Sequence, residues 1–185
     1  MWTDKLPRII HPLILQKLLN LEITPAAKRY SEEEYNLEGF RQWVESLGAP
    51  HRRQHFLHIA GTKGKGSTAA ICEALLRALG LATAMFSSPH LEHYGERFRF
   101  DGRPWSKEEF DAKLAEFEER LTPQQRQGFE GPQPFRTVFE VLTALALIEF
   151  GKRAQALAQE TPPRRQVVCW ETGLGGRLDC TNIVT

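Results

Sequence analysis

The sequence predicts an α/β domain in which helices flank a parallel β-sheet with a P-loop-type turn. Residues 55–60 form a short apolar run that ends in the glycine-rich segment 61–66. Apolar residues then recur at helical spacing over residues 67–79, and a second apolar run covers residues 81–87. Strand, glycine turn, helix and strand make a βαβ unit, which implies parallel strands and a right-handed crossover.

Two helices are predicted in the first half of the chain. The helix over residues 67–79 is expected to end at Gly80, because glycine is common just past a helix terminus. Its apolar residues are predicted to share one side: Cys72, Leu75, Leu76 and Leu79. Residues 37–47 show the same spacing and are followed by Gly48 and Pro50, so they predict an earlier helix.

Two more helices are predicted in the second half. Ser106 and Glu109 form a capping-box pattern, which begins a helix with one apolar face: Phe110, Leu114, Phe117 and Leu121. Residues 137–150 are apolar almost all round, so that helix is expected to be largely buried. Residues 122–134, rich in Gln, Pro and Gly, are predicted to form the loop between the two helices.

Two strands are also predicted there. Residues 97–100 alternate charged and aromatic side chains before a turn at Asp101-Gly102, which is typical of a strand. Residues 167–170 are expected to form a buried strand that runs into Glu171 and a glycine loop at 173–176.

The boundary between two parts of the chain is predicted near residue 50. Residues 1–50 are interpreted as a helical and loop segment that packs on the core, with an amphipathic stretch at 9–19 and a polar loop at 23–36. Residues 51–185 are then the nucleotide-binding α/β domain. The apolar run 182–185 looks like an entering strand with no turn after it, so this domain is expected to be incomplete at its C-terminus.

Composition excludes several classes of protein. The 24 Lys and Arg residues balance 23 Asp and Glu residues, whereas nucleic-acid-binding domains usually carry a strong basic excess. Three cysteines without a CxxC pair argue against a zinc site and a disulfide framework, and fit a reducing cytoplasm. No segment has the length of a membrane span or the pattern of a targeting signal.

Residues 61–68, Gly-Thr-Lys-Gly-Lys-Gly-Ser-Thr, have the parts of a phosphate cradle. Glycines let backbone N–H groups converge on phosphate oxygens, and Lys65 can reach the β- and γ-phosphates. The pattern departs from GxxxxGK[ST], because Gly66 stands where Ser or Thr is usual. The alternative is a glycine turn without ligand, but two close lysines repel one another unless an anion lies there. The candidate nucleotide-binding residues are Thr62, Lys63, Gly64, Lys65, Gly66 and Ser67.

Glu171 and Ser88 each lie at the carboxyl end of a predicted parallel strand, so they are expected to lie close together at one edge of the sheet. A carboxylate at the end of an apolar strand is costly unless a cation or a donor accompanies it. Glu171 can therefore hold a metal ion or pair with Arg177. Ser88-Pro89 is by itself a weak signal that usually marks a turn, and His90 is given no role.

Four segments in order resemble the folylpolyglutamate synthase/dihydrofolate synthase family of the Mur ligase superfamily. They are His58-Ile59-Ala60-Gly61-Thr62-Lys63-Gly64-Lys65-Gly66-Ser67, Ser87-Ser88-Pro89-His90-Leu91, Thr137-Val138-Phe139-Glu140 and Glu171 to Asn182. Gly66 directly after Lys65 is a distinctive feature of this family. Lys63 resembles the eukaryotic branch, since bacterial members mostly carry Asn there, and Cys180 is a variant at a position often occupied by Ala.

The resemblance implies a Mur-ligase-like ATP-binding domain and a role for each candidate residue. Lys65 would be catalytic, Mg²⁺ would be held by Ser88, Glu171 and Ser67, and folate or pteroate by Thr137, Phe139 and Asp179. From the residues alone, Phe139 is equally a core side chain, and Asp179 equally caps a turn before Thr181.

The implied reaction is ATP-dependent addition of L-glutamate to a folate or dihydropteroate carboxylate through an acyl phosphate, with release of ADP and phosphate. The partners would be small molecules, without nucleic acid or membrane, and the full-length protein would be a monomer. The family's C-terminal glutamate-ligase domain is expected to be absent, so this chain alone is expected to be inactive.

Three alternatives remain open. A peptidoglycan Mur ligase shares the chemistry but typically carries Thr or Ser after the lysine, so Gly66 counts against it. A non-catalytic, truncated nucleotide-binding module is the alternative from another class. A simple P-loop kinase would leave the segment 173–182 unexplained.

Overall fold

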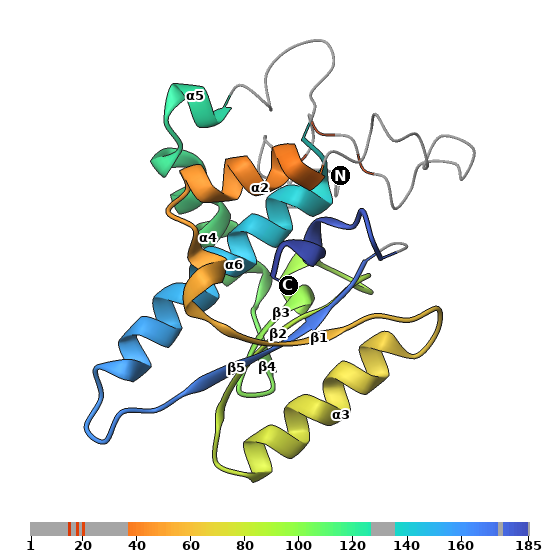
Figure 1. The fold of residues 1–185 in the computed structure, drawn as a ribbon, viewed down its shortest axis with the longest axis vertical. Coiled ribbons are helices and arrows are strands. Elements are labelled where there is room, and N and C mark those ends of the chain that lie inside the picture. Colours follow the sequence, from red (N-terminus) through yellow and green to blue (C-terminus); the bar gives the residue numbers. More distant parts are fainter. Residues whose placement is uncertain are drawn as a thin grey trace, which may run out of the picture.

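A five-stranded β-sheet forms the centre of the protein in the computed structural model, which describes residues 15, 18, 20, 37–126, 136–173 and 176–184. The strands are β1 (His55–Ile59), β2 (Ala82–Phe86), β3 (Phe98–Phe100), β4 (Arg103–Pro104) and β5 (Gln166–Glu171). Their order across the sheet is β1-β5-β2-β3-β4 (Figure 1).

The sheet has a parallel part and an antiparallel edge. β5 lies between β1 and β2 and runs parallel to both, whereas β3 is antiparallel to β2 and to β4. The β3–β4 hairpin turns at Asp101 and Gly102, whose φ angles of 49° and 80° are the left-handed values that tight hairpin turns need. The predicted α/β class is confirmed, and the sheet is mixed.

Helices cover both faces of this sheet. They are α2 (Leu37–Ser46), α3 (Lys65–Ala78), α4 (Lys107–Arg120), the short α5 (Pro123–Arg126) and α6 (Val138–Ala158). Three 3₁₀ helices, η2 (Pro50–Arg53), η3 (Tyr94–Arg97) and η4 (Cys180–Val184), connect or end these elements. In Figure 1, α3 covers one face of the sheet, while α6, with α2 and α4 beside it, lies on the other. None of the helices in the described ranges is both long and apolar enough to cross a membrane.

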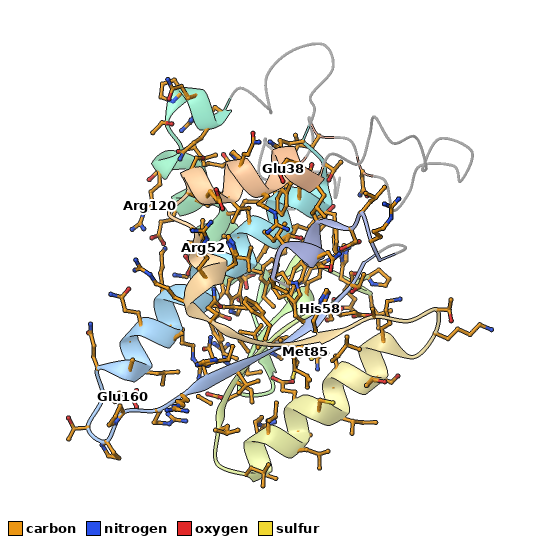
Figure 2. All side chains as sticks on the ribbon, in the orientation of Figure 1. Glu38, Arg52, His58, Met85, Arg120 and Glu160 are labelled. Carbon is orange, nitrogen blue, oxygen red and sulfur yellow. The ribbon has the colours of Figure 1, made fainter. Side chains whose placement is uncertain are left out.

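The two faces of the sheet are packed differently. On the α6 face, the rings of Phe86 and Trp170 lie 4.8 Å apart, and those of Phe98 and Trp105 stack at 4.6 Å. Under α3 the core is small and consists of Ala69, Met85 and Cys169. Figure 2 labels Met85 on this side of the sheet. Large aromatic rings therefore fill only the α6 layer.

The predicted apolar side of α3 is confirmed for Cys72 and Leu76, which pack against the core under α3, and is wrong for Leu75 and Leu79. Leu75 and Leu79 are 60% and 77% exposed, and the positions that face the sheet include Ala69 and Glu73. Glu73 is only 3% exposed, and its Oε1 accepts hydrogen bonds from Thr83 Oγ1 (3.3 Å) and the Gly102 N–H (3.0 Å). A charged residue takes a core position because these donors satisfy it.

Other elements confirm or correct the sequence analysis. The capping box at Ser106 and the buried helix after Thr137 are both present. Residues 180–184 form η4 and not a strand, because turn bonds such as Asn182 N–H to Asp179 O (2.9 Å) curl this segment. The predicted loop at 122–134 begins instead with α5, whose preceding Thr122 accepts a capping hydrogen bond from the Gln125 N–H.

Some of the predicted segments fall outside the described residues. These parts are the loop at 23–36, positions 127–134, and most of the amphipathic stretch at 9–19. Leu15 and Leu18, two described residues of that stretch, are buried in the main core. The division of the chain near residue 50 stays a prediction.

We expect Leu145→Ala to lower the free energy of unfolding by about 2–5 kcal/mol, because Leu145 is fully buried in α6 and its removal leaves a cavity. Leu75→Ala, the same change at an exposed position of α3, is the matched control and should stay within about 0.5 kcal/mol. Urea denaturation followed by circular dichroism measures both. Equal effects would contradict the burial pattern of α3 and α6.

Candidate functional site

The three parallel strands end at one edge of the sheet. Ile59 of β1 pairs with Glu171 of β5, and Phe86 of β2 pairs with Trp170. The segments that follow these strands therefore leave the sheet side by side. In open α/β sheets this carboxyl edge is where ligands bind.

The glycine-rich segment forms a loop between β1 and α3. Gly64 is the N-cap of α3, with φ 75°, a left-handed value that glycine adopts without strain. The first helical bond runs from the Thr68 N–H to Gly64 O (2.9 Å), so the N–H groups of Lys65, Gly66 and Ser67 precede it at the helix start. Strand, loop and helix are confirmed, and the helix begins two residues earlier than predicted.

The carboxylate of Glu171 lies beside this loop. Glu171 is 4% exposed, and its Oε2 accepts a hydrogen bond from the Ser88 N–H at 3.1 Å. A Cβ atom placed on Gly66 would lie 3.4 Å from Oε2 and 3.5 Å from Oε1. These distances are ordinary van der Waals contacts, so Glu171 packs directly against Gly66. The predicted proximity of Ser88 and Glu171 is confirmed by their hydrogen bond.

Glu171 is not paired with Arg177, which is exposed. Burial raises the pKa of the Glu171 carboxyl group, while the Ser88 N–H and the charges of Lys65 and Arg97 act in the opposite direction. Carboxylate and hydroxyl oxygens are the ligands that Mg²⁺ prefers, so Glu171, Ser88 and Ser67 fit a divalent cation by their chemistry. In the described part of the chain, no cluster of three His, Cys, Asp or Glu residues that could hold a metal is found.

The loop after β2 is held by one carboxylate. Glu96 of η3 accepts hydrogen bonds from the N–H groups of Leu91, Glu92 and His93, each at 2.8 Å. These backbone donors lower the pKa of Glu96 from 4.5 to about 2. Glu96 was not predicted as a site neighbour, although a Glu three positions after an N-cap residue, here His93, is a known capping signal.

The three predicted folate-side residues have structural contacts of their own. Thr137 Oγ1 accepts the Glu140 N–H (3.1 Å) as the N-cap of α6, and Asp179 Oδ1 accepts the Thr181 N–H (2.9 Å). The alternative interpretation of Asp179, that it caps a turn before Thr181, therefore agrees with the structure. The ring of Phe139 lies 5.8 Å from that of Phe86, and a Cβ on Gly173 would be 2.6 Å from it.

His58 and Thr172 are site neighbours that the sequence analysis did not single out. His58 Nε2 and Thr172 Oγ1 share a hydrogen bond of 2.9 Å at the end of β1 and β5. Burial lowers the pKa of His58, and the negative charge of Asp179 partly opposes this shift. No pattern in the sequence indicates this contact, because His58 lies inside a strand. Figure 2 labels His58 beside β1.

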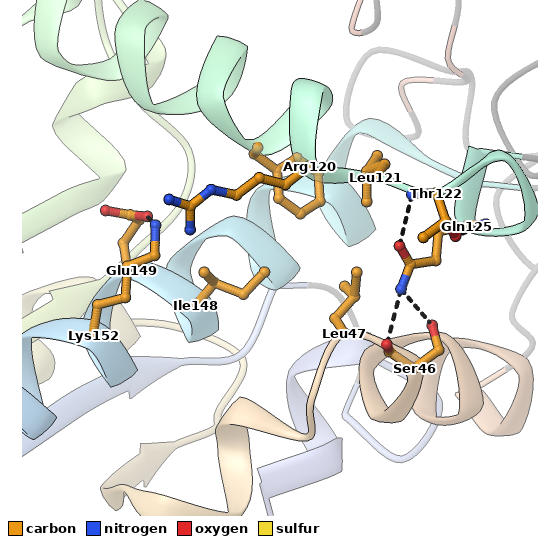
Figure 3. A pocket seen from close by; sticks show the side chains of 10 residues that line it. Ser46, Leu47, Arg120, Leu121, Thr122, Gln125, Ile148, Glu149 and Lys152 are labelled. Atoms are coloured by element: carbon orange, nitrogen blue, oxygen red, sulfur yellow. Dashed lines mark hydrogen bonds and ion pairs between the residues drawn. The ribbon is translucent and has the colours of Figure 1, made fainter.

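A cavity of about 290 Å³ lies away from this edge, between the ends of α2 and α4 and the middle of α6 (Figure 3). Leu47, Phe117 and Ile148 line its apolar part. Its polar side chains already have partners: Gln125 Nε2 donates to the backbone oxygen of Ser46, and Lys152 pairs with Glu149. The candidate site at the sheet edge does not extend into it.

Comparisons of the sequence identify relatives with a common activity, although no family model matches the chain. The chain is 39% identical over 144 residues to the dihydrofolate synthase/folylpolyglutamate synthase of Mycobacterium tuberculosis, covering 76% of this chain and 28% of the relative. The corresponding Bacillus subtilis protein is 33% identical, covering 78% and 30%. The chain spans from 16% to 30% of the length of the first three curated relatives.

Solved structures of the same group share the fold. Mycobacterium tuberculosis folylpolyglutamate synthase complexed with ADP superposes with a TM-score of 0.68 at 33% identity, over 93% of this chain and 33% of that chain. Escherichia coli FolC in complex with DHPP and ADP gives 0.64 at 32% identity, covering 88% and 34%. A bifunctional synthase with Mn, AMPPNP and L-glutamate bound gives 0.63 at 33% identity, covering 90% and 37%.

The charge on Glu96 is expected to stabilise the loop after β2. Its folded pKa lies below the ordinary value of 4.5, so its contribution is complete above that pH and is lost as the pH falls toward 2. The stability advantage of the wild type over Glu96→Gln should therefore shrink as the pH is lowered from 6 to 3. Thermal unfolding at several pH values measures it, with Glu92→Gln as control. A constant advantage across this range would contradict the assignment.

Proposed function

The chain is homologous to folylpolyglutamate and dihydrofolate synthases over about 80% of its length, and from this we propose that it supplies the nucleotide-binding part of an ATP-dependent glutamate ligase. The complete protein would add L-glutamate to a folate or dihydropteroate carboxylate through an acyl phosphate. The observation that carries the proposal is the glycine loop with Glu171 held against Gly66 and Ser88. Solved structures of relatives with this fold contain ADP and DHPP in one case and L-glutamate in another.

The residues of the loop are assigned to the phosphates of ATP. The N–H groups at the start of α3 can donate to phosphate oxygens, and the helix dipole favours negative charge there. Lys65 is half-buried at the first helical position, and its Cγ lies 3.8 Å from a Cβ placed on Gly61. The Lys65 side chain therefore runs close to the start of the loop. Lys65 would neutralise charge on the transferring phosphoryl group, while exposed Thr62, Lys63, Gly64 and Ser67 line the phosphate path.

The divalent cation is assigned to Glu171, Ser88 and Ser67. When bound, the cation would neutralise charge on the nucleotide phosphates and on the phosphoryl group being transferred. The Ser88 N–H and the Lys65 charge oppose the effect of burial on the pKa of Glu171 and so favour its carboxylate form. One related structure contains a Mn ion with AMPPNP, and we expect Mg²⁺ to serve in the same place here.

The acceptor substrate is assigned to the neighbouring side of the same edge. Phe139 offers an aromatic face, while Thr137 and Asp179 flank it as polar groups. Because Thr137 and Asp179 already hold backbone N–H groups, only their remaining lone pairs would serve the pterin ring. We propose a cytoplasmic protein that acts on small molecules. Its three cysteines are free, as a reducing compartment requires.

A non-catalytic nucleotide-binding module is the second candidate. The glycine loop at the start of α3 is sufficient for this function, because phosphate binding at a helix start needs no catalytic side chain. Assaying the complete protein to which these residues belong separates the two candidates. Glutamate-dependent product supports the ligase, and nucleotide binding without product supports the module.

Lys65→Ala in the complete protein should reduce ligase turnover by a factor that corresponds to about 2–4 kcal/mol of transition-state stabilisation. The reason is the loss of a positive charge at the transferring phosphoryl group. Turnover is measured as ADP release that depends on glutamate and on a pteroate substrate. Lys107→Ala, which removes a lysine from the start of α4, is the control. Near-normal turnover of the Lys65 variant would refute its assignment.

The 185-residue chain by itself is expected to bind ADP but to make no folylpolyglutamate or dihydrofolate. The phosphate loop is local to one βαβ unit, whereas the active relatives are about three times as long. The chain is incubated with ATP, Mg²⁺, glutamate and a pteroate substrate, and the products are followed by mass spectrometry. Product above that of a Lys65→Ala control would overturn this expectation.

A further inference from the structure

The loop that carries Ser88 is fastened at two points by Arg97 of η3. The Ser87 N–H donates to the backbone oxygen of Arg97 at 3.0 Å. The side-chain Nε of Arg97 donates to His90 Nδ1 at 2.9 Å. One bond precedes Ser88 and the other follows Pro89, so Arg97 fixes the loop on both sides of the candidate metal ligand.

Arg97 is only 1% exposed, although it carries a permanent charge. Burying a guanidinium is costly unless its surroundings compensate the loss of water. Part of this compensation comes from Tyr94, whose ring centroid lies 5.4 Å from the guanidinium carbon. The ring of His90 in turn lies 4.5 Å from that of Tyr94. Arg97, Tyr94 and His90 therefore form one packed cluster, which we call the loop clamp.

Glu96, the residue before Arg97, completes the restraint. Its three bonds to the N–H groups of residues 91–93 hold the second half of the loop. Two consecutive residues of η3 thus hold the segment 87–93. At its start, Ser88 donates its N–H to Glu171 Oε2. A shift of the loop would remove the one hydrogen bond that the Glu171 carboxylate accepts within the described part of the chain.

We propose that Arg97, acting through His90, is a positioning residue that holds Ser88 beside Glu171 and so sets the divalent-cation side of the nucleotide site. This inference rests on the proposed function. Arg97 would touch neither nucleotide nor substrate. The hydrogen bond also fixes the ring of His90: Nδ1 accepts from Arg97 and therefore carries no proton. Residues that orient metal ligands in this way commonly change metal affinity by about 10- to 100-fold when they are replaced.

The test compares ADP binding with and without Mg²⁺. His90→Phe keeps a ring against Tyr94 but removes the acceptor, and Arg97→Lys keeps the charge but removes Nε. Arg103→Lys is the matched control, since Arg103 lies in β4, shortly after η3, and pairs with Glu109 at the surface. Affinities of the 185-residue chain for ADP are measured by titration calorimetry in excess Mg²⁺ and in EDTA, and circular dichroism verifies folding.

We expect His90→Phe and Arg97→Lys to weaken ADP binding in Mg²⁺ by about tenfold or more. In EDTA both variants should stay within about twofold of the wild type, because the phosphate loop itself is unchanged. Arg103→Lys should match the wild type in both buffers. A purely structural role of the clamp would instead weaken binding equally with and without the metal.

The outcomes separate this inference from the proposed function. If the wild type binds no ADP in either buffer, the proposed function fails and the inference falls with it. If the wild type binds ADP and His90→Phe keeps the full Mg²⁺ effect, the clamp has no positioning role and only the inference is overturned. Should Arg97→Lys fail to fold, His90→Phe alone decides, because His90 is only half-buried.

Discussion

The buried carboxylate of Glu171 is the constraint on which the candidate site depends. A carboxylate with so little exposure is unfavourable unless donors or cations lie close to it. Its stabilising groups come from separate segments: the Ser88 N–H after β2, Lys65 at the start of α3 and Arg97 in η3. A single buried carboxylate thus contacts three connections that are distant in the sequence, and it also packs against position 66.

The stiffness of this edge comes from the aromatic layer below it. Phe86 and Trp170 are the residues directly before Ser87 and Glu171, and their rings are packed at 4.8 Å. Both side chains are fully buried, so the strand ends that present the site have little freedom to shift. The opposite layer contains small residues such as Ala69, which lets α3 approach the sheet closely. The aromatic layer on the α6 side therefore restrains the strand ends. The small residues on the other side let the start of α3 lie near them.

The sequence predicted the features that depend on near neighbours. Capping at Ser106, the buried helix after Thr137 and the phosphate loop all follow from patterns within a few residues, because helix starts and glycine turns are local events. The proximity of Ser88 and Glu171 followed from a general rule about parallel strand ends. The predictions are wrong where the burial of a side chain depends on residues that are far away in the sequence. Leu75 is exposed and Glu73 buried because donors from Thr83 and Gly102 reach α3, which no periodicity reveals.

The same limit explains which site residues were missed or misread. The contacts of Arg97 with His90 join two side chains through a loop conformation that has no sequence signature. Residues 182–185 were predicted to enter a strand because they are apolar, but residues 180–184 form the 3₁₀ helix η4, in which Thr181 O accepts a hydrogen bond from Trp170 Nε1 (3.0 Å). The assigned roles of Thr137, Phe139 and Asp179 depend on a ligand, and their contacts within the protein explain only their positions.

The central position of β5 has a consequence for the order in which the sheet folds. β1, α3 and β2 are made first, yet β1 and β2 share no hydrogen bonds, since β5 is inserted between them and pairs with both. Before residues 166–171 are synthesised, β1 and β2 have no strand between them to pair with. The phosphate loop, which follows β1, then also lacks its contact with Glu171. Contacts of such long sequence separation form slowly. The binding edge is therefore assembled in one late step, when a single strand joins the two halves and brings its carboxylate with it.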